Sequence, residues 1–209
     1  MENTAACPDL QAEHGLSVYM ETSGHKILAD TGQSSHTWDN AVKMGVDLNA
    51  IDTVIISHGH YDHAGGLLSF AKINPDAEIY MQKSAAGAFY HGERYIGIDR
   101  NILDLPRLHL IDGDKKIDEE LSLFSGISGR RNWSSGNRLL TEKINGADVQ
   151  DSFQHEQYLV VTENGKKILL SGCAHNGILN ILDRYRELYD SDPYAVISGF
   201  HMMKNTAYY

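Results

Sequence analysis

The sequence predicts an α/β domain in which strands and helices alternate along the chain. Short β-like runs recur between segments whose apolar residues have helical spacing, and no fixed-period repeat or low-complexity linker interrupts them. A length of 209 residues is enough to bury one large core. The composition, 42% hydrophobic and 22% charged, is close to the globular average and argues against disordered, collagen-like and coiled-coil classes. We therefore expect a single domain over residues 1–209.

The first half of the chain predicts a hairpin followed by alternating helices and strands. Ser23-Gly24 joins two β-like runs, and the short apolar run that ends at Ser57 is typical of a buried strand. Asn74-Pro75 ends one of the helices. The predicted elements are strands over 16–21 and 25–29, a helix over 37–44, a strand over 53–57, a helix over 65–73, a strand over 78–81, a helix over 84–90 and a strand over 107–111.

The second half contains one irregular segment and a second hairpin. Residues 126–151 are interrupted by four glycines and show no clean period, so we expect an active-site loop or lid there. Asn164-Gly165 separates two apolar runs, over 158–162 and 167–171, and predicts a hairpin. A helical stripe over 177–189 and a final strand over 194–198 follow.

Charge and cysteine usage exclude several classes of function. Lys and Arg number 18 against 28 Asp and Glu, a formal net charge of −10, which disfavours nucleic acid and anionic lipid as partners. No uncharged apolar stretch approaches the roughly 18 residues of a membrane span, and no signal peptide is visible. Two cysteines do not make a disulfide framework. We expect a cytoplasmic protein without a membrane partner.

Four candidate metal ligands lie within six positions directly after the predicted strand over 53–57. They are His58, His60, Asp62 and His63. Core histidines satisfied by hydrogen bonds come singly, so a cluster of four favours a metal site. In an extended segment His58 and His60 point to the same side and reach one ion, and Asp62 and His63 then serve a second. Nitrogen and oxygen ligands suit zinc first, with manganese or iron as alternatives.

This cluster resembles the HxHxDH motif of the metallo-β-lactamase-fold hydrolase superfamily. Other segments extend the resemblance over nearly the whole chain and are similar to the subgroup labelled dihydropteroate-synthase-like or dihydropterin-ribofuranosyl-aminobenzene-phosphate-synthase-like. These segments are Glu13-His14-Gly15, Asp30-Thr31-Gly32, His155-Glu156-Gln157, Ser171-Gly172-Cys173-Ala174-His175 and Gly199-Phe200-His201.

The resemblance implies a four-layer αβ/βα sandwich with two mixed β-sheets flanked by helices. It also implies a hydrolase that uses a metal-bound hydroxide, held by one or two divalent ions, on an ester, phosphoester or related small molecule. Asp62 and Asp30 are the expected catalytic carboxylates, with Asp30 orienting a ligating histidine. The alternatives are a degenerate member that binds metal or ligand without turnover, and a di-iron redox protein.

The remaining ligands stay open at this point. The third ligand of the first ion is either His155 or His175. Cys173 is either a thiolate ligand or an inert small hydrophobe. The family usually continues through another helix and strand to a further histidine beyond the residues present here. Either His201 supplies that ligand, or the second site is incomplete, or the chain is a shortened form of a longer relative. Absence of the family's final helix and strand would expose apolar surface, which raises the possibility of a homodimer.

Three further residues are candidates for substrate binding. The resemblance places the loop of His14 near the metal. Arg130 and Arg131 are able to clamp a phosphate or carboxylate, although adjacent arginines in a glycine-rich segment are usually solvated. The expected substrate is a small molecule, with a phosphorylated or pterin-like compound as the specific expectation.

Overall fold

The structure is a computed structural model that describes residues 1–5 and 7–201. The chain forms two compact units. The first unit comprises Met1–Ala86 and Gly97–Ile111, and the second comprises Gly87–Ile96 and the chain from Asp112 onward. Each unit has its own five-stranded sheet and its own buried core.

The first unit is built on a mixed sheet with the strand order β1-β2-β3-β4-β7. β1 and β2 form the predicted antiparallel hairpin, whereas β2, β3, β4 and β7 run parallel to one another. Side chains of β3 are buried throughout, as expected for a central strand of a parallel sheet. The strand bounds are β1 Val18–Glu21, β2 Lys26–Ala29, β3 Thr53–Ile55, β4 Glu78–Gln82 and β7 Leu108–Ile111.

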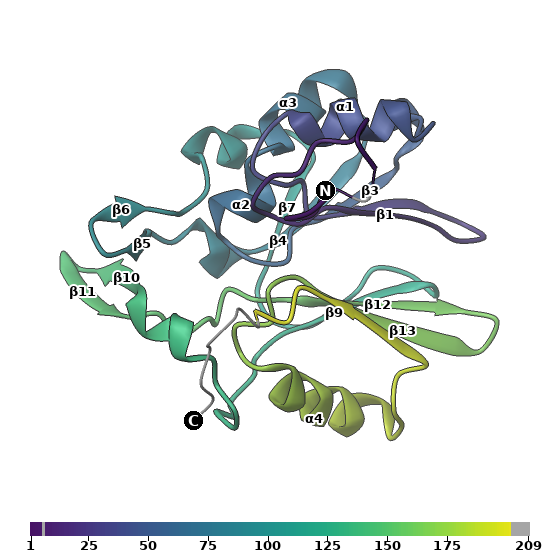
Figure 1. The fold of residues 1–209 in the computed structure, drawn as a ribbon. Helices are drawn as coiled ribbons and strands as arrows, with labels where there is room; N and C mark the ends of the chain where they lie inside the picture. Colours follow the sequence, from purple (N-terminus) through teal and green to yellow (C-terminus); the bar gives the residue numbers. More distant parts are fainter. Residues whose placement is uncertain (6, 202–209) are drawn as a thin grey trace. The chain divides into compact units, whose positions relative to one another are not determined.

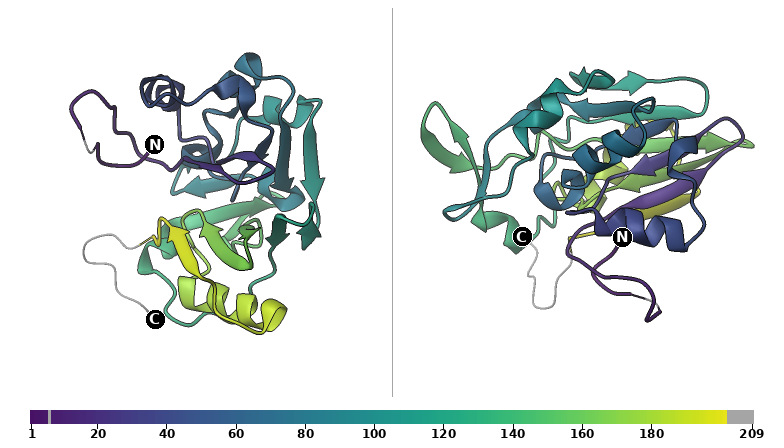
Figure 2. Two further views of the ribbon diagram at one scale, coloured as in Figure 1. Left: turned by 90° about the vertical axis from the view of Figure 1, so that its right-hand side faces the viewer. Right: turned by 90° about the horizontal axis from the view of Figure 1, so that it is seen from above.

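Helices cover one face of this sheet (Figures 1 and 2). Trp38 of α1 and Phe70 of α3 contact each other at a ring-centroid distance of 5.3 Å, and the Trp38 indole N–H donates to Ser69 Oγ. The helical elements are α1 His36–Lys43, α2 Tyr61–Ala64, α3 Leu67–Ile73 and the 3-10 turns η1 Leu48–Ala50, η2 Lys83–Ala86 and η3 Arg100–Asp104.

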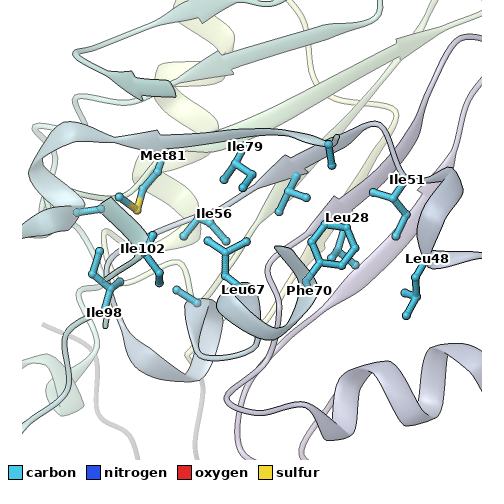
Figure 3. Close-up of a cluster of buried hydrophobic side chains, with 14 of the residues drawn as sticks. Leu28, Leu48, Ile51, Ile56, Leu67, Phe70, Ile79, Met81, Ile98 and Ile102 are labelled. Atoms are coloured by element: carbon cyan, nitrogen blue, oxygen red, sulfur yellow. The ribbon is translucent and has the colours of Figure 1, made fainter. Parts of the chain in front are cut away.

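The core of the first unit lies between the helices and the sheet (Figure 3). Leu28 and Ile79 from the strands pack with Leu67 and Phe70 from α3, and Ile56 follows β3 into the same cluster. Each large apolar side chain buried in this way stabilises the fold by roughly 1.5 to 3 kcal/mol. This packing fixes the end of β3, where the histidine cluster begins.

The second unit contains a mixed five-stranded sheet, a small antiparallel sheet and α4. The large sheet has the order β14-β13-β12-β9-β8, in which only β13 and β14 are parallel, and α4 packs against it through Ile181 and Tyr185 (Figure 2). The small sheet has the order β11-β10-β5-β6. The bounds are β5 Phe89–His91, β6 Arg94–Tyr95, β8 Lys115–Lys116, β9 Leu121–Phe124, η4 Ser135–Leu139, β10 Leu140–Ile144, β11 Ala147–Gln150, β12 Tyr158–Glu163, β13 Lys166–Ser171, α4 Ile178–Tyr189 and β14 Ala195–Ser198.

Two sequence-based expectations differ from the structure. The helix predicted over 84–90 is wrong, because the chain makes only the turn η2 and then enters β5, whose Phe89 is buried and pairs with Glu142 of β10. The segment over 126–151 is not irregular throughout, since it contains η4 and the β10–β11 hairpin. Asn145 and Gly146 form the turn of that hairpin with positive φ at both residues, as a type I′ turn requires.

The predicted α/β class, with mixed sheets flanked by helices, is confirmed. Across residues 1–5 and 7–201, none of the helices has both the length and the apolar character needed to cross a bilayer.

Candidate metal centre

The first unit gathers the four residues of the cluster at the carboxyl end of β3. His58 lies in the loop, His60 is the extended residue just before α2, and Asp62 and His63 lie in the single turn of that helix. All four side chains are buried. The ring of His58 lies 4.6 Å from that of His60 and 4.1 Å from that of His63, centroid to centroid. The structure therefore brings the three imidazoles together, as their spacing predicts.

Asp30, which follows β2, orients two of these histidines. Its carboxylate is fully buried and accepts hydrogen bonds from the Ser57 main-chain N–H at 2.7 Å, the Ser57 hydroxyl at 2.7 Å and His63 Nδ1 at 2.6 Å. Because the Ser57 hydroxyl donates to Asp30, its oxygen accepts from Nδ1 of His58, 2.8 Å away. Both rings thus carry their proton on Nδ1 and present the Nε2 lone pair for coordination.

The backbone around α2 is held by a close approach of neighbouring segments. The Thr31 N–H and hydroxyl both donate to the His63 carbonyl, at 2.7 and 3.0 Å. A Cβ added at Gly65 would lie 2.2 Å from the Gln33 carbonyl oxygen, and one added at Gly66 would lie 2.3 Å from the Thr31 carbonyl oxygen. No side chain fits at either position, so these glycines let the 31–33 segment fix the helix that carries the ligands.

Asp62 is an anionic member of the cluster. Burial raises the pKa of its carboxyl, but the charges of His63, His60 and His14 lower it further than burial raises it. Its Oδ2 lies 3.5 Å from His63 Nε2 and 3.4 Å from Nε2 of the more exposed His14. The predicted substrate-binding residue His14 therefore lies beside the cluster within the first unit.

The second unit carries the other candidate ligands on two of its loops. His155 lies just before β12, and its Nε2 is 3.1 Å from Oδ2 of Asp151. His175 lies in the turn after β13, with Nδ1 3.0 Å from the side-chain oxygen of Asn137. Both histidines are 2% exposed, so burial does not distinguish them. Each has an orienting partner of the kind that metal-binding histidines have, and the choice of third ligand stays open.

Two further candidate ligands lie near His175, one in the turn after β13 and the other after β14. The His201 ring is 4.3 Å from the His175 ring, centroid to centroid. Cys173 is partly exposed and forms no disulfide with Cys7. Sequence reasoning did not single out Asp151 or Asn137. A carboxylate four residues before a histidine could have identified Asp151, whereas no local signal connects Asn137 with a residue 38 positions away.

Glu156 fixes the turn that carries His175. Its buried carboxylate accepts from the main-chain N–H of His175 at 2.7 Å, from the main chain and side chain of Asn176 at 2.9 Å, and from the Tyr158 hydroxyl at 2.7 Å. Burial raises the pKa of this carboxyl, although these donors favour its charged form. One buried side chain thus holds consecutive main-chain groups of the ligand turn.

The two arginines predicted to bind substrate have different surroundings. Arg130 donates to the side-chain oxygen of Asn176 at 3.0 Å and lies over the Trp133 ring at 4.6 Å. Arg131 forms an exposed ion pair with Asp183 at 2.6 Å. Their guanidinium groups therefore bind different partners in the second unit and do not form one clamp, and anion binding by either stays a prediction.

A small cavity of about 160 Å³ lies at the start of α4, beside the turn that carries His175. Its walls combine apolar side chains with two polar ones. The lining residues are Asn132, Ser134, Ala174, Gly177, Ile178, Leu179 and Phe200.

Comparison with known proteins identifies the family. Residues 10–133 match the metallo-beta-lactamase superfamily. An uncharacterized protein of Methanocaldococcus jannaschii, MJ0448, is 32% identical over 92% of this chain and 74% of its own length. The 7,8-dihydropterin-6-methyl-4-(beta-D-ribofuranosyl)-aminobenzene-5'-phosphate synthase of the same organism is 26% identical over 92% of this chain and 72% of its own length.

A solved structure agrees with these matches. Tm1679, described as a metal-dependent hydrolase of the beta-lactamase superfamily, superposes with a TM-score of 0.82 and 33% identity over 98% of this chain and 75% of its own. The family match covers more than half of the chain, and the likeness in fold covers almost all of it. The chain therefore belongs to the metallo-β-lactamase superfamily and has its α/β fold.

Proposed function

We propose that this protein is a metal-dependent hydrolase of a small-molecule ester or phosphoester. The observation that carries the proposal is the buried group of His58, His60 and His63, in which His63 donates to Asp30 and His58 donates to the Ser57 hydroxyl oxygen. Buried imidazoles oriented by a carboxylate are the usual construction of a catalytic metal site. A structural core would not need three of them at one strand end.

The donor chemistry fits a divalent ion, with zinc as the first expectation and manganese or iron as alternatives. The first unit offers His58 and His60 for one ion, and Asp62 and His63 for a second. The second unit offers the further candidate ligands, which are His155 or His175 for the first ion and His201 or Cys173 for the second. A bound divalent ion lowers the pKa of a coordinated water and polarises the carbonyl or phosphoryl oxygen of the substrate.

The protein's own residues prepare this chemistry. Asp30 keeps the proton of His63 on Nδ1, so that the ring offers Nε2. Asp62 stays ionised at neutral pH because its pKa is lowered, and it supplies negative charge beside His63. Glu156 holds the turn of His175 in one conformation. These contacts reduce the reorganisation that ligand binding would otherwise require.

The substrate expectation is a small phosphorylated or pterin-like molecule bound in the reducing cytoplasm. Support comes from the name of the pterin phosphate synthase that is 26% identical to this chain. The two cysteines form no disulfide with each other, which is compatible with a reducing compartment. His14, beside Asp62, and Arg130, beside the His175 turn, are the proposed contacts for an anionic group.

The test combines metal analysis with hydrolysis of 4-nitrophenyl acetate and bis(4-nitrophenyl) phosphate. We expect chelation to abolish hydrolysis and added zinc, manganese or iron to restore it. The variants His58→Ala and His60→Ala should lose more activity than the ~100-fold that loss of an outer partner reaches. The control is His109→Ala, because His109 is half exposed and pairs with Glu78 on β4.

Three results would contradict the proposal. Unchanged hydrolysis in the His58 and His60 variants would show that the cluster is not catalytic. A wild-type chain that binds metal but hydrolyses neither ester would support the degenerate binding member, and an iron-loaded chain that accepts electrons without hydrolysis would support the redox alternative.

A further inference from the structure

Asn137 contacts both the ring and the main chain of His175. Its side-chain oxygen lies 3.0 Å from His175 Nδ1, and its side-chain nitrogen donates to the His175 carbonyl at 2.7 Å. Asn137 is fully buried, on the short turn η4 of the 126–151 segment. Its own carbonyl accepts from the Gln150 side chain at 2.7 Å. The Gln150 side chain thus holds the main chain of Asn137 in place.

These two contacts determine the tautomer of His175. A main-chain carbonyl only accepts hydrogen bonds, so the Asn137 nitrogen must face it and the Asn137 oxygen must face the ring. An amide oxygen also only accepts, so Nδ1 of His175 must carry the ring proton. The lone pair therefore lies on Nε2, which is the atom that neutral histidine offers to a metal.

Other contacts fix the plane of the His175 ring and the main chain of His175, but not the rotation of the ring within its plane. Phe153 stacks on His175 at 4.6 Å with planes only 5° apart, which sets the ring plane. Glu156 holds the main-chain N–H of His175. Neither contact distinguishes Nδ1 from Nε2, because a stacked phenyl ring permits a flip of the imidazole within its plane. The Asn137 contact specifies which nitrogen faces away.

We infer that Asn137 is a positioning residue that selects the metal-binding tautomer and orientation of His175. This inference rests on the proposed function, because it takes His175 as a metal ligand. It assigns a site role to the 126–151 segment, since η4 supplies the amide. A neutral amide orients the ring without adding charge to the site, unlike the carboxylate that orients His63.

The test measures metal binding by Asn137→Ala against a matched control, Asn180→Ala. Asn180 is also a buried asparagine that links the 126–151 segment to the His175 turn, through Arg131 and the Asn176 carbonyl, but it does not contact His175. The readouts are the cobalt dissociation constant by chelator competition, the visible absorption of the cobalt-loaded protein, and thermal unfolding of the metal-free protein.

We expect Asn137→Ala to weaken cobalt binding about 10- to 100-fold and to change the cobalt absorption bands, as loss of an outer partner does. Asn180→Ala should leave both unchanged even if it lowers the unfolding temperature. Equal effects of the two variants would show that Asn137 only supports the segment, and would overturn the inference. So would unchanged metal binding in Asn137→Ala.

Two more variants separate this inference from the proposed function and cover a folding defect. Asn137→Asp keeps an acceptor for the ring proton and should bind cobalt more tightly than Asn137→Ala; binding no tighter than in the alanine variant would overturn the inference. His175→Ala tests the ligand itself. If it leaves cobalt binding unchanged, His175 is not a ligand and the inference loses its premise, while the proposed function stands with His155 as the third ligand. An effect of His175→Ala without an effect of Asn137→Ala refutes the inference alone.

Discussion

Two buried histidines, one in each unit, have Nδ1 held in chemically different ways. Asp30 holds His63 at 2.6 Å, and Asn137 holds His175 at 3.0 Å. A charge-assisted hydrogen bond is shorter and roughly twice as strong as a neutral one. The carboxylate also accepts two bonds from Ser57, whereas the amide returns a bond to the main chain of the histidine that it orients. The first histidine is therefore anchored by charge, and the second by the shape of a planar amide.

The largest expected effect follows from removing the charged anchor. Asp30→Ala leaves the His63 ring and both Ser57 donors without their buried acceptor, which should cost about 3 to 5 kcal/mol of unfolding free energy. Urea unfolding of the metal-free protein measures this loss. A variant as stable as wild type would show that the charge contributes nothing to the fold and would remove the contrast between the two histidines.

A subtler change replaces the charged partner of the first histidine with a neutral amide. Asp30→Asn should preserve more of the fold, because asparagine tolerates the positive φ of 58° at this position. Its Oδ1 still accepts from Ser57, but an amide nitrogen replaces the oxygen that faces His63. The ring must then accept, which moves its proton to Nε2. We expect metal affinity to fall about 10-fold or more, measured by chelator competition. Unchanged affinity would mean that His63 binds metal through another tautomer or not at all.

A smaller effect should appear in the pH dependence of stability. Burial raises the pKa of Glu156 in the folded protein above its value in the unfolded chain. Glu156 therefore contributes most to the free energy of unfolding at low pH, below its pKa in the unfolded chain. That contribution is lost as the pH rises through the raised pKa of the folded protein. Glu156→Gln should lack this decline, although the amide fits its main-chain donors less well and lowers stability overall. Urea unfolding of the metal-free proteins across pH 4–8 compares the slopes; parallel curves would contradict the assignment.

The smallest effect is expected at Arg131. Its ion pair with Asp183 is exposed on both sides, and such pairs contribute about 0.2 to 1 kcal/mol. Arg131→Ala should therefore change thermal stability little and leave cobalt binding unchanged. Arg131 is in the same segment as Asn137, so a large loss of metal affinity in this variant would indicate that the position of the whole segment, rather than one amide, orients His175.

The sequence predicts the elements whose signals are local. The hairpin at Asn164-Gly165 and the helix that follows Gly177 are found close to their predicted bounds. Asn145-Gly146 carries the same turn signal. The residues on either side of it are largely exposed and polar and lack a clean alternation, so the sequence does not predict strands there. The helix expected over 84–90 was wrong because pairing of Phe89 with a strand more than 50 residues away overrides local propensity.

The same distinction holds for the candidate site. The close spacing of His58, His60 and His63 in the sequence predicts that their rings lie at the end of the same strand. The structure places the three rings together there. The partners that orient the rings depend on tertiary contacts. Asn137 meets His175 across 38 residues, and the acceptor of the Ser57 hydroxyl lies 27 residues before it. Residue type alone does not reveal such pairs, because asparagine and aspartate are common in turns.

The absence of room at Gly65 and Gly66 has a consequence for how this site could be altered by evolution or engineering. A Cβ at either position would collide with the carbonyl oxygens of Gln33 or Thr31, which belong to a segment about 30 residues away in the chain. Libraries that randomise only residues 58–66 would therefore sample mostly variants in which the helix is displaced. Substitutions in residues 31–33 would not remove these collisions, because the oxygens belong to the main chain. Productive libraries of the ligand loop therefore keep both glycines and vary the other positions.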